Sequence, residues 1–259
     1  MTTGTDLSAT IAAPHPILSG SAAFGLQEKH AHVGDGGDVH RAIAIACRAL
    51  YAEGCMKGIG GHVSARVPNE RAYWINPHHL EFDEVSATDI VKISFDGELL
   101  EGSVYPSPGV YFHPHVYERR ADVNAIVHTH SPYATRLAAL QRPLRMMNVQ
   151  SVYFAGDLNI SPDPLEGIAE GLGEANNALL AYHGVLTVGA QLGTAVTLHM
   201  TLEEAAAFDL SLGADAVPMS DENVDRVQRV MYGSDYLEKT WDLMVRKHGA
   251  AHDAARPAR

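Results

Sequence analysis

The chain has 259 residues, with 19 Lys and Arg against 31 Asp and Glu, which gives a formal net charge of −12. This length fits one large domain, and 46% hydrophobic residues are enough to build its core. The acidic balance and the lack of a Lys/Arg cluster argue against nucleic acid or an anionic membrane as partner. No apolar run approaches the roughly 20 residues that span a bilayer, and no secretory signal opens the chain, so we expect a cytoplasmic protein.

Three regions can be distinguished along the chain. Residues 1–37 mix small and polar residues without a sustained period, which predicts a flexible N-terminal arm. We expect a single domain over 38–245 and a polar, Ala-rich C-terminal tail over 246–259. The two cysteines, Cys47 and Cys55, are too few for a disulfide scaffold and are expected to be reduced thiols.

The predicted elements alternate between helices and strands, which indicates a mixed α/β domain. Apolar residues at spacings of three and four predict a helix over 39–53, stopped by Gly54. A Gly-rich loop then leads into short strands, with a hairpin turn at Asp96 and Gly97. A strand-like alternation is expected within 57–66, after the Gly-rich loop, and further strands are expected over 73–75, 90–94 and 124–130, with a pair over 178–188 broken at Gly184. The later helices are expected over 110–120, 131–140, 165–176 and 194–212.

Three of the 15 histidines form the strongest candidate site. Residues two apart in a strand project to the same side, so the imidazoles of His128 and His130 are expected to lie close together. His183 occupies a second strand-like segment, directly before Gly184. Three imidazoles suit Zn, Mn, Fe or Co and leave coordination positions open for a substrate. The alternative is that these are surface or core histidines satisfied by other groups.

The motifs taken together resemble the class II aldolase/adducin family over about residues 39–215. They are Gly58-Ile-Gly-Gly-His-Val-Ser-Ala-Arg66, Tyr73-Trp-Ile-Asn-Pro77, Phe82-Asp-Glu-Val85, Asp89-Ile-Val91, His128-Thr-His-Ser-Pro-Tyr133 and Tyr182-His-Gly184. The resemblance implies a three-layer α/β/α domain around a mostly antiparallel sheet, and often a homotetramer with active sites between subunits. It also implies one divalent metal ion, Zn, Mn or Fe(II), held by His128, His130 and His183.

The sequence departs from the sugar-phosphate aldolases of this family at two positions. Those enzymes carry Pro-Ser-Ser-Glu before the helix that precedes the His-x-His strand, and the Glu is their general acid/base. This chain has Pro106-Ser-Pro-Gly109 instead and so lacks that carboxylate, which resembles an adducin head-like branch of the family. His62 stands where the phosphosugar enzymes have Asn. It either contacts the substrate or is a buried loop histidine bonded to backbone.

The resemblance also suggests which residues meet the substrate. We expect the substrate to lie against Gly60, Gly61, His62 and Ser107. The catalytic candidates are His62 and His113, because His113 lies one helical turn after Gly109 and could replace the missing carboxylate. The alternative for His113 is a helix histidine that caps the helix or packs in an interface.

Three hypotheses about function follow. The first is a metal-dependent lyase that cleaves a carbon–carbon bond next to a carbonyl or carboxylate. Its simplest form is a decarboxylase of a hydroxy or keto acid, including aromatic acids, because the loss of CO2 needs no base to begin. The second is a non-haem iron(II) oxygenase that decarboxylates an arylpyruvate-type acid oxidatively. The third is a non-catalytic, adducin-like binding module, which the three retained histidines argue against.

Overall fold

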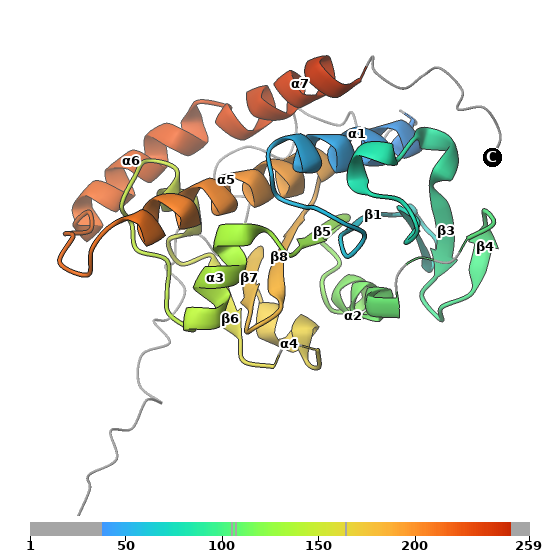
Figure 1. Cartoon of the computed structure of the whole chain (residues 1–259), viewed down its shortest axis with the longest axis horizontal. Helices are drawn as coiled ribbons and strands as arrows, with labels where there is room; N and C mark the ends of the chain where they lie inside the picture. Colours follow the sequence, from blue (N-terminus) through green and yellow to red (C-terminus); the bar gives the residue numbers. More distant parts are fainter. Residues whose placement is uncertain (1–37, 105, 107, 164, 250–259) are drawn as a thin grey trace, which may run out of the picture.

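The computed structural model describes residues 38–104, 106, 108–163 and 165–249, so the expected arm over 1–37 and Ser107 lie outside the described residues. An eight-stranded sheet with the order β4-β3-β2-β1-β5-β8-β7-β6 forms the centre (Figure 1). Neighbouring strands are antiparallel except β6 and β7, which are parallel. The strands are β1 (His62–Arg66), β2 (Ala72–Ile75), β3 (Val91–Ser94), β4 (Leu99–Glu101), β5 (Ala125–Thr129), β6 (Leu158–Ser161), β7 (Asn177–Leu180) and β8 (Gly184–Gly189).

Helices cover both faces of the sheet. Helices α1, α3 and α5 pack on one face, and α2 and α4 lie on the other; α6 and α7 lie outside α5 (Figure 1). This arrangement confirms the predicted three-layer α/β/α domain with a mostly antiparallel sheet. None of the helices in the described ranges is long and apolar enough to cross a bilayer. The helices are α1 (Val39–Ala52), α2 (Phe112–Arg119), α3 (Pro132–Leu140), α4 (Ile168–Leu172), α5 (Leu192–Ser211), α6 (Asp221–Gly233) and α7 (Tyr236–His248).

The central strand β5 shows how the sequence pattern selects these layers. Ala125 and Val127 belong to the core beneath α1 and α5, whereas Ile126 belongs to the core beneath α2 and α4. His128 follows the same alternation and therefore projects to the α2 side, where it is buried at the end of an apolar strand. An imidazole at this position replaces a core side chain and needs a partner.

Several elements differ from the sequence-based expectation. Helix α4 has five residues, much shorter than the helix expected over 165–176, because Gly167 and Gly173 flank it with φ of 63° and 56°. Helix α7 continues to His248, which is three residues into the segment expected as a polar tail over 246–259, and residues 250–259 lie outside the described residues. Helices α6 and α7 are not among the predicted elements. His183 lies in the turn before β8 rather than in a strand.

A buried histidine joins α5 to the two central strands. His199 has no exposed surface, and its ring hydrogen-bonds the hydroxyl of Thr129 in β5 at 2.7 Å and that of Thr187 in β8 at 3.0 Å. Burial lowers the pKa of His199 from the usual 6.5 to about 3, because the charged form is poorly solvated there. The ring is therefore neutral in the folded protein at neutral pH.

We expect acid to weaken the fold through His199. Below pH 6.5 the unfolded chain binds a proton on this residue that the folded chain does not take up until about pH 3. The contribution of His199 to the unfolding free energy is therefore fully present above pH 6.5 and is lost as the pH falls toward 3. The slope of this contribution approaches about 1.4 kcal/mol per pH unit. Urea unfolding across this window should show a smaller pH slope for His199→Gln than for wild type. Equal slopes would contradict the assignment.

Candidate metal centre

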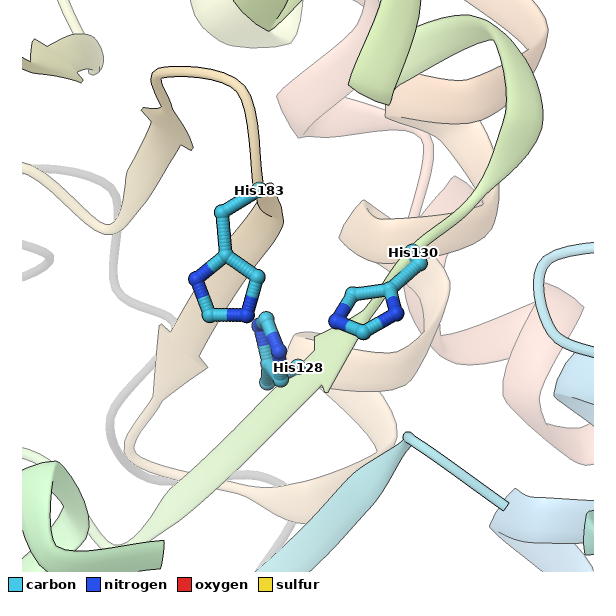
Figure 2. A group of neighbouring side chains, drawn as sticks. All are labelled: His128, His130 and His183. Carbon is cyan, nitrogen blue, oxygen red and sulfur yellow. The ribbon is translucent and has the colours of Figure 1, made fainter. Parts of the chain in front are cut away.

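Three histidines from two neighbouring segments converge at the end of β5. His128 is in β5, His130 follows that strand, and His183 lies in the turn that enters β8 (Figure 2). The pairing of β5 with β8 places Thr129 opposite Val185, which brings the two segments together. The ring centroids are 4.8 to 5.2 Å apart, and one ring nitrogen of each histidine lies within 4.8 Å of the others. The predicted ligand set therefore forms one compact group.

The protonation of His128 and His130 favours metal coordination. The Nδ1–H of His128 donates to the backbone oxygen of Val185 at 3.0 Å, which leaves Nε2 as the ligand atom. Burial, and next the neighbouring His62, hold the pKa of His128 well below its usual range. His130 is exposed at its outer side, yet partial desolvation of its ring, and next His183, lower its pKa as well. Neutral imidazoles are the metal-binding form, so protons compete little for His128 and His130 at neutral pH.

Gly184 permits the close approach of the two segments. A Cβ at this position would lie 2.5 Å from the backbone oxygen of Thr129, and 3.0 and 3.2 Å from the rings of His130 and His128. The first contact is with backbone and cannot be relieved by a side-chain rotation. Glycine is therefore required here for steric reasons, and the Tyr182-His-Gly sequence follows from the geometry of the site.

We expect Gly184→Ala to destabilise the protein by about 1–3 kcal/mol, the usual cost of forcing atoms into a packed interior. The substitution should also weaken metal binding, because it pushes the two ligand segments apart. Urea unfolding and metal titration would measure both effects. Gly233→Ala is the matched control, since a Cβ there meets nothing within 4 Å and should leave both properties intact. Equal unfolding midpoints for Gly184→Ala and wild type would contradict this account.

The Gly-rich loop before β1 lies against the same group. A Cβ on Gly60 would be 3.1 Å from the ring of His130, so this residue packs directly on a ligand. A Cβ on Gly61 would instead meet Phe82 at 2.5 Å, which shows that Gly61 packs against the protein interior. The loop is fastened at Gly58, whose N–H donates to the Glu81 carboxylate at 2.7 Å. Of the two glycines predicted to contact the substrate, Gly60 therefore lies against the histidine group and Gly61 does not.

His62 extends the histidine group across the sheet. It pairs with His128 in the β1–β5 register, and the two ring centroids are 5.2 Å apart. His62 is only 4% exposed, and neither ring nitrogen has a hydrogen-bond partner among the described residues. Burial, and next His113, lower its pKa well below the usual value, so the ring is neutral. The structure therefore does not show the backbone-bonded loop histidine considered above.

His113 is completely buried beside His62, with ring centroids 5.5 Å apart. Its Nδ1 lies 2.8 Å from the Ser64 hydroxyl, which lies 2.7 Å from the Tyr117 hydroxyl. Within the described part of the chain, its Nε2 has no hydrogen-bond partner. Burial is also the main reason that the pKa of His113 falls well below its usual range. A chain of three groups therefore ends in an unsatisfied ring nitrogen near the ligands.

Sequence reasoning missed Ser64 and Tyr117. The signal was present, because Ser64 lies two residues after His62 on one strand face, and Tyr117 lies one helical turn after His113. Phe112 was also missed; its ring is 5.5 Å from that of His128 and forms an apolar wall. Ser107, the remaining predicted substrate contact, falls outside the described residues.

The donor set fits a divalent metal ion. Three imidazole ligands, with Nδ1 of His128 oriented by a backbone carbonyl, are typical of Zn, Mn, Fe(II) or Co sites that keep open positions. No Asp or Glu from the described ranges joins this group. Such a site can polarise a substrate oxygen, while His62 and His113 offer neutral N–H and N groups beside it.

Comparisons with known proteins agree with this architecture. Residues 41–210 match the family model for the class II aldolase and adducin N-terminal domain. The chain is 32% identical over 180 residues to the meiotically up-regulated gene 14 protein of Schizosaccharomyces pombe, covering 65% of this chain and 70% of that protein. It is 30% identical over 166 residues to a 5-deoxy-D-ribulose 1-phosphate aldolase of Bacillus thuringiensis serovar kurstaki, covering 61% and 78%.

A solved structure supports the same assignment at the level of the fold. L-fuculose 1-phosphate aldolase from Glaciozyma antarctica PI12 superposes with a TM-score of 0.77 at 24% identity, covering 89% of this chain and 98% of that one. The sheet and helix layers described above are therefore shared with that structure. On the family match and these likenesses together, the chain belongs to the class II aldolase and adducin family.

Proposed function

We propose that this protein is a metal-dependent lyase that cleaves a carbon–carbon bond next to a carbonyl or carboxylate. His128, His130 and His183 would hold one divalent ion, which supplies a Lewis acid for a substrate oxygen. Aldolase chemistry in the Bacillus thuringiensis relative supports the reaction class. The substrate is a small molecule, and assembly into a homotetramer remains a prediction from the resemblance.

The observation that carries this proposal is the pair of unsatisfied imidazoles beside the ligand group. Both nitrogens of His62 and Nε2 of His113 are buried without a hydrogen-bond partner among the described residues. Leaving a buried polar group unpaired costs about 1–3 kcal/mol, and such groups concentrate where a ligand completes them. A substrate carboxylate or carbonyl can accept from the N–H of His62.

Decarboxylation is the finer form of the proposal. Aldol cleavage by the family mechanism needs a carboxylate where this chain has Gly109. In a decarboxylation, the bond between the carboxylate carbon and its neighbour breaks, the electron pair stays on the neighbouring carbon next to the carbonyl, and CO2 leaves. No base is needed for this step. A proton must then be delivered to that carbon.

The hydrogen-bonded chain behind His113 is suited to deliver that proton. If Tyr117 donates to Ser64 and Ser64 donates to Nδ1 of His113, each hydrogen is used once and the remaining ring proton is on Nε2. Nε2 is the atom without a partner. As His113 gives this proton to the substrate carbon, Ser64 would pass its proton to Nδ1 and Tyr117 would pass its proton to Ser64, so the imidazole stays neutral and the chain recovers one proton from solvent after product release.

The test is a substrate screen on protein reconstituted with Zn, Mn or Fe(II). Hydroxylated aromatic acids and keto acids would be assayed for CO2 release, ketose 1-phosphates for aldehyde release, and all reactions for oxygen uptake. CO2 release without oxygen uptake supports the proposal. Aldehyde release without CO2 would replace the decarboxylase by an aldolase, and oxygen uptake coupled to turnover would favour the iron(II) oxygenase. A protein that binds no metal and turns over no substrate would instead favour the non-catalytic, adducin-like binding module.

A further inference from the structure

Two buried polar side chains of α5 hold the chain on both sides of His130. His199 contacts the residue before His130, and Glu203 contacts the start of α3 just after it. His199 and Glu203 are one helical turn apart and therefore lie on the same face of α5. His199 is 0% and Glu203 is 7% exposed. Neither belongs to the ligand group, and the proposed reaction uses neither.

The hydrogen bonds of His199 have one consistent direction. The Thr187 hydroxyl donates to the backbone oxygen of Ala195 at 2.9 Å, so it can only accept from His199 Nδ1–H. Nε2 of His199 must then accept from the Thr129 hydroxyl, which itself accepts the Ser131 N–H at 3.1 Å. Every donor and acceptor is used once. The backbone on either side of His130 is therefore tied, through Thr129, to β8.

Glu203 holds the other side of His130. Its carboxylate accepts the N–H of Tyr133 at 2.9 and 3.1 Å and the N–H of Ala134 at 2.8 Å. These amides belong to the first turn of α3, which has no intrahelical acceptors for them. A carboxylate at a helix N-terminus is also favoured by the helix dipole. Glu203 thus fixes where α3 begins, two residues after His130.

We propose that His199 and Glu203 are positioning residues that set the geometry of His130 in the metal centre. His130 needs this support because it lies beyond the end of β5 with an exposed side chain, unlike the buried His128. The inference rests on the proposed function only in requiring that the three histidines bind a metal ion. Helix α5 provides none of the three proposed ligands, but through His199 and Glu203 it would affect metal affinity.

The test is titration of the metal-free protein with Co2+, followed by the visible absorption of the bound ion, which reports coordination geometry. Wild type and His128→Ala define full and lost binding. We expect Glu203→Ala and His199→Leu to bind Co2+ about 10–100-fold more weakly with an altered spectrum, as is usual when outer partners of ligands are lost. Glu203→Gln keeps one acceptor oxygen and should recover part of the affinity.

Thr129→Val gives a milder version of the same test, since it removes one hydroxyl from the network while retaining the side-chain shape, and it serves if His199→Leu does not fold. Thr197→Val is the matched control. It removes a buried hydroxyl of α5 that bonds Gly193 and Leu237 instead of the strands, and should leave the spectrum unchanged.

Wild-type affinity and spectrum in Thr129→Val and Glu203→Ala would overturn the inference while the metal site stands. Wild-type protein that binds no Co2+ would overturn both this inference and the proposed metal site. Equal losses in Thr197→Val and Thr129→Val would also overturn it, because the effect would then be general loosening of α5.

Discussion

His128→Ala is expected to lower metal affinity by more than about 100-fold, beyond the usual cost of losing only an outer partner of a ligand. His128 is the central member of the group, with its ring 5.2 Å from that of His130 and 4.8 Å from that of His183. Without His128, only two of the three proposed ligands, His130 and His183, remain to coordinate the ion. Elemental analysis of untagged protein, with calorimetric titration of the metal-free form, would measure the loss.

His115→Ala is the matched control for this experiment, because His115 is an exposed histidine on α2. It should retain the wild-type metal content. If His128→Ala keeps one ion per chain with unchanged affinity, the ion is bound elsewhere and the proposed centre is wrong. The loss of turnover should follow the loss of metal in the same samples.

His113→Phe is expected to lower kcat by about 100- to 10,000-fold, the usual contribution of a positioned acid or base. Metal content should stay at the wild-type level, which separates this variant from His128→Ala. Phenylalanine preserves the ring that packs against Phe112 at 4.5 Å and Tyr73 at 6.0 Å, so the core should remain intact. Steady-state kinetics on the substrate identified by the screen would measure the effect.

The same chain predicts a graded series. Tyr117→Phe removes the far donor but leaves Ser64 in contact with His113, so its kcat should fall less than that of His113→Phe. Tyr153→Phe is the control, because it also removes a buried phenol hydroxyl, one that bonds the backbone of Met231. A His113→Phe protein with wild-type kcat would exclude His113 from proton delivery.

The ligand positions could be predicted from sequence because each follows a local rule. The period of two in a strand aligns His128 with His130, and the glycine after His183 signals a close backbone approach. The contacts that support them could not be predicted in this way. Ser64 and His113 are 49 residues apart, and Thr129 and His199 are 70 apart, so their pairing depends on the completed packing.

The same distinction applies to the fold. The strands around the centre alternate or run apolar over a few residues and are visible in the sequence. Helices α6 and α7 are not, because each buries only two side chains. Helix α7 packs on α5 and α1, and α6 packs on the 3-10 helix Ser151–Phe154 and on α7, so neither packs on the sheet. A pattern-based reading detects helices that lie on the core more readily than helices that lie on other helices.

The pairing of β5 with β8 has a consequence for how the proposed metal ion would be acquired. Helices α3 and α4 and strands β6 and β7 separate these two strands along the chain, yet they are neighbours in the sheet. Such non-local pairing forms late because a long loop must first be closed. A refolding chain in which β5 and β8 have not met has no complete binding site. The rate of cation uptake during refolding would therefore report when β5 pairs with β8, and not when the chain first collapses.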